Sequence, residues 1–311
     1  MLALFFAVNM GGSSYAAAFG ATYGGKILSR EKTRIFFILF VIMGALFFGQ
    51  KVSATLGKGI VPEDYMTFKT LIVIFMSAGL CMFLGNMINI PQSTSLVTVA
   101  AISGIGAYYH NINLPTIYYC AIFWVILPVA SFFLTYWVTG IVYPPRKENF
   151  WIYERYINQR GNLKAFAVVT SCYNAFSVGS NNVANVVGPL GSYMDLPLTA
   201  MLVLFAFFYG LGGLVFSGPM KTVSDQIVPL GLLTVSIVSF VCATLIIIAS
   251  LFGVPQSFVM LQMAAMFAVS ALKHGPEATL ESPLTRRTLY SWAINPLIAF
   301  AISYVLMHFF V

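Results

Sequence analysis

Charge is the scarcest property of this sequence. Only 8% of its 311 residues are Asp, Glu, Lys or Arg, whereas soluble domains carry about 25%. With 59% hydrophobic residues and a mean hydropathy of +0.87, the chain holds more apolar surface than a soluble core of this length can bury. The composition therefore excludes a soluble protein and predicts a multi-pass integral protein of the cytoplasmic membrane, surrounded by lipid.

Metal ligands and catalytic groups are also few. The four cysteines lie inside apolar stretches without zinc-type spacing, so we interpret them as small hydrophobic residues. The three histidines are far apart in sequence and no HExxH pattern is present. An intramembrane enzyme would need a nucleophile–base pair or metal ligands at depth. We therefore expect no enzymatic activity, no metal centre and no cofactor apart from a coupling ion.

The net charge of +7 does not indicate a nucleic-acid partner, because most basic residues lie in short loops between apolar segments. Three loops are clearly basic, and they contain the ranges Lys26–Arg34, Arg146–Lys164 and Lys273–Arg287. They follow the first, fifth and ninth of ten apolar segments, so all three fall on one side of the membrane. The positive-inside rule makes that side cytoplasmic and places both termini outside.

The two halves of the chain share four landmarks in the same order. These pairs are Gly11–Gly20 with Gly179–Gly188, Ile60–Pro62 with Ile227–Pro229, Pro91–Ser93 with Pro255–Ser257, and Trp124…Pro128 with Trp292…Pro296. Their offsets are 168, 167, 164 and 168 residues. A nearly constant offset indicates an internal duplication.

A membrane-spanning helix needs about 20 residues, and ten apolar segments are long enough to be candidates. We place them near 2–23, 35–51, 66–87, 92–109, 115–142, 165–190, 198–216, 228–252, 254–272 and 289–310. The first repeat is then 1–142, a cytoplasmic linker is 143–163, and the second repeat is 164–311. Because each repeat has five segments, the second enters the membrane from the opposite side. The fold class expected is all-α, with two inverted repeats and broken or re-entrant helices where they meet.

Polar residues interrupt the first and sixth segments at matching positions. They are Asn9, Gly11, Gly12, Ser13 and Ser14, and then Gly179, Ser180, Asn181, Asn182 and Asn185. Such groups are costly at mid-membrane depth unless they face protein or water. Gly permits an unwound backbone and Ser and Asn cap helices, so we expect two half-helix starts whose N–H groups bind an anion. The alternative is that small residues simply allow close helix packing.

A second pair of polar stretches begins at the Pro-Gln-Ser landmarks. Gln92, Ser93, Thr94 and Ser95 follow the first proline, and Gln256 and Ser257 follow the second. Pro favours the start of a helix, and hydroxyl groups supply donors there. We expect the first repeat to contribute more ligands from this element. For Ser257, an ordinary helix cap is the alternative.

The second copy of the first landmark, GSNNVANVVGPL over residues 179–190, resembles the GANDVANAxG signature that the inorganic phosphate transporter family carries twice. The family's PVSTTH stretch is similar to Pro91–Leu96, and its late arginine pair and Trp…Pro helix are similar to Arg286-Arg287 and Trp292…Pro296. The resemblance covers nearly the whole chain. It implies inverted repeats that carry an oxyanion between the two signatures, often with sodium coupling.

The departures from the family pattern concern acidic residues. Ser14 and Asn182 stand where the signature has aspartates. Phosphate near neutral pH still carries protons and gains from a carboxylate acceptor, whereas sulfate carries none and needs donors only. The chain is therefore most similar to the sulfate permease branch, and sulfate is the expected substrate. Phosphate, molybdate, selenate and thiosulfate are alternatives.

The coupling ion is open between sodium and a proton. Losing the acids weakens a sodium site, although unwound backbone carbonyls could still supply oxygen ligands. Proton coupling needs a titratable group, and the candidates all lie near segment ends or in loops: Glu63, Asp64, His110, Asp195, Asp225, His274 and His308. We expect alternating access by the two repeats around a fixed site. An anion channel lined by the same donors is the alternative, and a homodimer is compatible with the aromatic-rich surface.

Overall fold

The computed structural model describes residues 1–87, 92–143, 146–215 and 231–310. The helices in this part of the chain are α1 (Leu2–Gly24), α2 (Arg30–Ala54), α3 (Phe68–Met87), α4 (Thr94–Tyr108), α5 (Leu114–Val142), α6 (Phe150–Asn158), α7 (Arg160–Asn182), α8 (Ala184–Gly191), α9 (Leu198–Val215), α11 (Leu232–Leu251), α12 (Phe258–His274), α13 (Pro276–Glu281) and α14 (Pro283–Phe310). A π-helical turn, Thr55–Gly59, extends α2, and short 3-10 turns cover Glu63–Tyr65 and Lys147–Asn149. The described residues contain no strand, which confirms the all-helical class.

Each of the ten predicted segments corresponds to helix in the described residues. Five helices are long and apolar enough to cross a membrane, namely α1, α2, α5, α11 and α14. Helices α3, α4, α9 and α12 are apolar but shorter. Three predicted starts were wrong, because α2 begins at Arg30, α7 at Arg160 and α14 at Pro283, each several residues before the predicted start. Pro91, Asp225 and the second Ile-Val-Pro landmark (227–229) lie outside the described residues.

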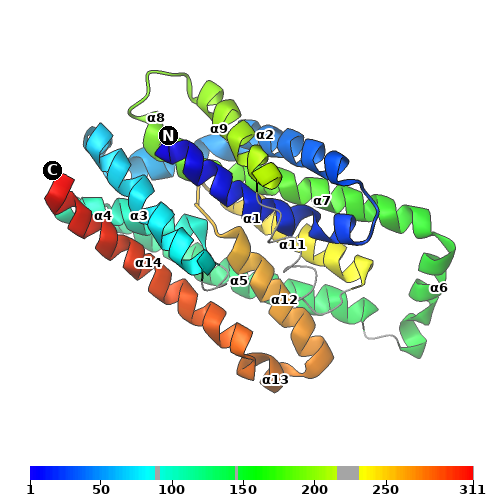
Figure 1. Cartoon of the computed structure of the whole chain (residues 1–311). Coiled ribbons are helices and arrows are strands. Elements are labelled where there is room, and N and C mark those ends of the chain that lie inside the picture. The colour runs from blue at the N-terminus through cyan, green and yellow to red at the C-terminus, as the bar shows by residue number, and fades with distance from the viewer. Residues whose placement is uncertain (88–91, 144–145, 216–230, 311) are drawn as a thin grey trace.

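Both chain termini lie at the same end of the helix bundle, and α6 and α13 lie at the opposite end (Figure 1). This arrangement places the linker and the loop after α12 at the same end of the bundle, as the distribution of basic residues predicts. Helix α6 stands beside the end of α5, where Tyr153 donates a hydrogen bond of 2.5 Å to the carbonyl of Val142. Which end faces the cytoplasm stays a prediction.

The helices pack across the two halves of the chain in matching pairs. Helix α1 packs on α9 and α2 packs on α7, while α4 packs on α14 and α12 packs on α5. Matched in order, helices α1 to α5 of the first half correspond to α7, α9, α11, α12 and α14 of the second half. The α1–α9 pair then corresponds to the α7–α2 pair, and the α4–α14 pair corresponds to the α12–α5 pair. The core therefore lies between the halves, which is where a duplicated chain buries the faces that one half alone would expose.

Signature glycines make two of the close backbone contacts between these helices. A Cβ atom on Gly11 would lie 1.7 Å from the carbonyl oxygen of Tyr209, and one on Gly179 would lie 2.1 Å from that of Val41. Val41 and Tyr209 are separated by the same 168 residues as the two glycines. Only a residue without a side chain allows the backbones this close. The close-packing interpretation is confirmed for both glycines.

The first signature does not unwind. Helix α1 is continuous from Leu2 to Gly24 and contains the whole stretch from Asn9 to Ser14, so the expected half-helix start there is wrong. Gly11, Gly12 and Ser14 are buried and Asn9 and Ser13 are half-buried, and the helix does not break. In the second signature, α7 ends at Asn182 and α8 begins at Ala184, with Val183 between them still in right-handed helical geometry.

The helix starts inside the bundle belong instead to α4 and α12. Both helices have fewer than 18 residues, so they are shorter than a full membrane span. Ser93 caps α4 by accepting a hydrogen bond from the N–H of Leu96, and Ser257 caps α12 by accepting one from Met260. Both serines are almost fully buried, at 3% and 1% exposure. The helix-cap interpretation of Ser257 is therefore confirmed, and the same description applies to Ser93.

Candidate functional site

One buried tyrosine joins the two signatures. The hydroxyl of Tyr209, on α9, donates a hydrogen bond of 2.6 Å to Ser14 Oγ on α1. It also accepts one of 3.3 Å from Asn182 Nδ2 on α7. Ser14 and Asn182 occupy matching positions of the two repeats and are the two sites where the resemblance places aspartates. The structure thus connects these two predicted residues through Tyr209, which the sequence analysis did not identify.

A second network connects the helix starts to the second signature. Asn185 Nδ2 donates to Ser95 Oγ at 3.2 Å, and Ser95 Oγ donates to the carbonyl of Gln256 at 3.0 Å. The N–H of Gln256 then donates to Asn181 Oδ1 at 2.8 Å. These four residues are each 0% exposed. The network therefore joins α4, α7, α8 and the segment before α12 into one buried polar cluster, all four members of which were predicted site residues.

Two amides in this cluster keep free hydrogen-bonding atoms. Both side-chain polar atoms of Gln256 are buried without a partner among the described residues, and so is Asn185 Oδ1. The orientation of Asn185 follows from the chemistry, because a carbonyl only accepts and so takes the single hydroxyl hydrogen of Ser95. Ser95 must then accept from Asn185 Nδ2. Buried polar atoms without a partner are costly, so these groups are suited to a bound ion or water.

The starts of α4 and α12 add hydrogen-bond donors beside the cluster. Ser93 and Ser257 accept the capping bonds, so each hydroxyl hydrogen remains available to donate. The first N–H groups of a helix have no partner within it. In the described residues, the N–H groups of Thr94 and Ser95 likewise make no backbone hydrogen bond. Ser95 donates to the carbonyl of Gln256, the residue before the α12 cap Ser257, so the two helix starts meet at this point.

The cluster is neutral. Every aspartate, glutamate, lysine and histidine that the structure describes is exposed, so none of them belongs to this buried cluster. No group of three or more His, Cys, Asp or Glu that could hold a metal ion occurs in the described ranges. The arrangement can replace the water around a fully ionised anion with fixed neutral donors.

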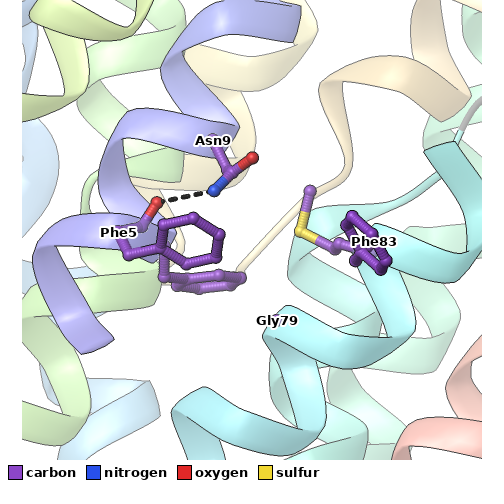
Figure 2. Close-up of a pocket in the computed structure, with 6 residues that line it drawn as sticks. Phe5, Asn9, Gly79 and Phe83 are labelled. Carbon is purple, nitrogen blue, oxygen red and sulfur yellow. Dashed lines mark hydrogen bonds between the residues drawn. The ribbon is translucent and has the colours of Figure 1, made fainter.

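Other predicted residues stay apart from both networks. Asn9 is half-buried and donates to the carbonyl of Phe5 in its own helix, 2.9 Å away. Figure 2 shows its side chain at a small apolar cavity between α1 and α3, facing Phe83. Ser13 donates to the carbonyl of Met10 in its own helix. We find no contact that brings Asn9 or Ser13 to the buried cluster.

The remaining predicted residues have structural partners. Gln92 donates through Nε2 to the carbonyl of Cys81 on α3, although its Oε1 has no partner among the described residues. Ser180 donates to its own helix at Ser177 and lies 3.0 Å from Ser250 on α11. The backbone of Gly12 lies against α9, where a Cβ on Gly212 would be 2.6 Å from the N atom of Gly12.

Sequence reasoning missed Tyr209 and Ser250. Tyr209 lies in an apolar stretch and pairs at the repeat offset with Val41, so comparison of the two halves gave no polar match. Ser250 is the penultimate residue of α11, and its hydroxyl accepts from Asn181 Nδ2 at 3.0 Å. A serine at the end of an apolar helix carries no signal until its neighbours are known.

Comparison with known proteins agrees with this arrangement. The sequence model of the phosphate transporter family matches the chain over residues 10–150 and 142–303. The chain belongs to this family. Family membership and the apolar helices together make it a multi-pass membrane protein and an anion transporter.

Individual members of the family are similar along the full length of the chain. The sulfate permease CysP of Bacillus subtilis (strain 168) is 30% identical over 312 residues, covering 100% of this chain and 86% of that protein. A protein of Methanocaldococcus jannaschii that carries the provisional name of phosphate permease is 22% identical and covers 96% of this chain and 92% of its own. A solved structure of a sodium-dependent phosphate transporter superposes with a TM-score of 0.82 at 20% identity, covering 99% of this chain and 96% of that one. The last comparison establishes the fold.

Proposed function

We propose that this protein imports sulfate across the cytoplasmic membrane by alternating access. The two repeats, 1–142 and 164–311, move around a fixed anion site, and the linker 143–163 lies in the cytoplasm. The anion lies where the starts of α4 and α12 meet the second signature. The donors are the free amide of Gln256, the hydroxyl groups of Ser93 and Ser257, and the first N–H groups of α4.

The observation that carries this proposal is the neutrality of the buried cluster. Sulfate carries no proton to donate at neutral pH, so a nearby carboxylate would only repel it. At the matching signature positions this chain has Ser14 and Asn182, and both are bonded to a neutral phenol. The full-length similarity to a sulfate permease supports the same choice of anion.

We further propose sodium as the coupling ion. The described Asp, Glu and His side chains are exposed, so none is in place to carry a proton through the cluster. Asn185 Oδ1, in contrast, is a buried oxygen without a partner among the described residues. Amide and backbone carbonyl oxygens are ligands that hard cations accept. Such a cation would offset the charge of the anion while both cross the membrane.

Labelled-sulfate uptake into liposomes tests this function directly. Purified protein should accumulate sulfate when a sodium gradient is imposed, with little inhibition by excess phosphate. Preloaded unlabelled sulfate should accelerate entry, because counterflow is a property of carriers, whereas a channel would give single-channel currents instead. Uptake of phosphate in place of sulfate would overturn the choice of anion. Uptake driven by a proton gradient alone would overturn the choice of coupling ion.

Variants on one helix test the position of the site. Ser95→Ala removes the hydroxyl that links Asn185 to Gln256 and should abolish uptake. Ser103→Ala is a matched control, because Ser103 is a buried serine on α4 whose hydroxyl donates to the carbonyl of Val99 in the same helix. Normal sulfate uptake by the Ser95→Ala protein would contradict the site assignment.

A further inference from the structure

Six consecutive carbonyl groups, from Leu251 at the end of α11 to Gln256 before α12, each accept a hydrogen bond from a side chain of another element. The donors to residues 251–256, in order, are Lys51 Nζ (3.1 Å), Tyr119 OH (3.4 Å), Thr55 Oγ1 (2.7 Å), Asn181 Nδ2 (2.9 Å), Trp124 Nε1 (2.8 Å) and Ser95 Oγ (3.0 Å). We call this set of six bonds the carbonyl clasp. Backbone groups of a connecting segment usually bond to backbone or to water. Here side chains hold every carbonyl in the segment.

The clasp runs from the protein surface to the proposed anion site. Leu251 and Phe252 are exposed, at 45% and 58%, whereas Val254 and Gln256 are both 0% exposed. Five of the six donors belong to the first repeat and only Asn181 to the second. The segment that ends at Gln256 is therefore held in place mainly by the opposite half of the chain.

Gln256 is fixed by its backbone and free at its side chain. Its carbonyl is held by Ser95 and its N–H by Asn181, whereas both polar atoms of its side-chain amide lack a partner among the described residues. A ligand group pre-positioned in this way loses less entropy on binding than one that must be ordered by the substrate. Any change in the clasp would displace that amide.

Trp124 and Thr55 act on the clasp without belonging to the site. The indole of Trp124, on α5, bonds the carbonyl next to Gln256, and this tryptophan is one of the landmarks shared by both repeats. Its counterpart Trp292 has no partner for Nε1 among the described residues, so the role of the two tryptophans differs. Thr55 lies in the π-helical turn after α2 and bonds Gly253, whose φ of +70° marks the turn of the segment.

We propose that Trp124 and Thr55 are positioning residues that set the affinity of the anion site by holding the segment 251–256 and, through it, the amide of Gln256. This inference rests on the proposed sulfate transport for the identity of the ligand. Its physical basis is the geometry of the clasp, which does not depend on which oxyanion is carried.

Paired variants test the inference by sulfate uptake in liposomes. Thr55→Val keeps the shape and removes the hydroxyl, while Thr55→Ser keeps the hydroxyl. Trp124→Phe removes the indole N–H, and Trp137→Phe is its control on the same helix, since Trp137 is 68% exposed. Losing one part-buried hydrogen bond should raise the sulfate KM about three- to tenfold in Thr55→Val and Trp124→Phe. The two controls should stay within about twofold of the wild type, a limit well below that loss.

A KM readout separates positioning from a purely structural role. A structural defect would lower the amount of folded protein and Vmax, and leave the KM of the remaining carriers unchanged. In a Gln256→Asn background, Thr55→Val should add little to KM, because both changes act through the same amide. Equal KM values in the variants and their controls, or a fully additive effect in the double variant, would overturn the inference.

The wild-type protein distinguishes this inference from the proposed function. If wild type takes up phosphate and not sulfate, the sulfate proposal fails, and the same four variants are then compared for phosphate KM. An increase confined to Thr55→Val and Trp124→Phe would still support the positioning role. If wild type takes up sulfate and these two variants match their controls, the positioning role fails alone.

Discussion

The hydroxyl of Tyr209 lies 2.6 Å from Ser14 Oγ, and through this contact the second half of the chain reaches the signature of the first. The same hydroxyl accepts from Asn182, so one phenol connects positions that the internal duplication makes equivalent. The phenol is 0% exposed and no described carboxylate is buried near it. The two signatures are thus joined by neutral groups, which has consequences that can be measured.

Tyr209→Phe should destabilise the protein without changing its helix packing. The ring remains, and Ser14 and Asn182 lose their shared partner, at a cost of about 1–2 kcal/mol. Thermal unfolding of the purified protein should shift to lower temperature. Tyr118→Phe is the control, because Tyr118 is 64% exposed. Equal unfolding temperatures for the two variants would show that the buried hydroxyl contributes nothing.

Asn182→Asp should exchange one substrate for another. A carboxylate at this position repels sulfate but can accept the proton that phosphate carries. Sulfate uptake should fall at least about tenfold, the effect of some 1.4 kcal/mol, and phosphate should become an effective inhibitor. Asn162→Asp, at an exposed position near the start of α7, should leave uptake unchanged. Sulfate uptake at the wild-type level in Asn182→Asp would argue against the neutral-donor site.

Gln256→Leu should separate function from stability. The side-chain amide of Gln256 makes no hydrogen bond to the described residues, so an apolar side chain of similar size removes no hydrogen bond to them. The thermal unfolding temperature should be unchanged or higher, because a buried unpaired amide is costly. Sulfate binding to the purified protein should nevertheless be lost. A variant that binds sulfate with wild-type affinity would remove Gln256 from the site.

Gly11→Ala should prevent close approach of α1 and α9. Its Cβ would lie 1.7 Å from the carbonyl oxygen of Tyr209, a backbone atom that cannot rotate away. We expect a loss of about 3 kcal/mol, at or above the upper end for overpacked cores, and little protein in the membrane. Gly79→Ala is the matched control, since a Cβ there meets nothing within 4 Å. The amount of folded protein in detergent extracts, measured by fluorescence-detection size-exclusion chromatography, should fall for Gly11→Ala and not for Gly79→Ala.

Cysteine labelling should determine the orientation of the bundle. The four native cysteines are all buried and give a low background. Leu2→Cys, at the N-terminal end, should react with a membrane-impermeant maleimide on intact cells. Arg155→Cys, on α6 at the opposite end, should react only after the cells are opened. The reverse pattern would place the basic loops outside and contradict the positive-inside assignment.

The sequence by itself determined the class of the protein, because composition and hydropathy are properties of residues regardless of contacts. It also predicted an internal duplication, since matching landmarks need no structure to be counted. The Pro-Gln-Ser stretches were identified correctly as capped helix starts, because Ser93 and Ser257 satisfy a local rule that involves residues only three positions apart.

Only the tertiary structure decided how the polar residues are used. Gly11 and Asn9 are neighbours in sequence, yet one packs against Tyr209 and the other faces a small apolar cavity. The expected unwinding of α1 does not occur, because Gly11 packs against α9 within an intact helix and Asn9 and Ser13 donate to carbonyls of that same helix. Hydrogen bonds between residues such as Trp124 and Pro255 join elements far apart in the chain. Such long-range contacts depend on how whole helices pack, and a local pattern of residues does not predict that packing.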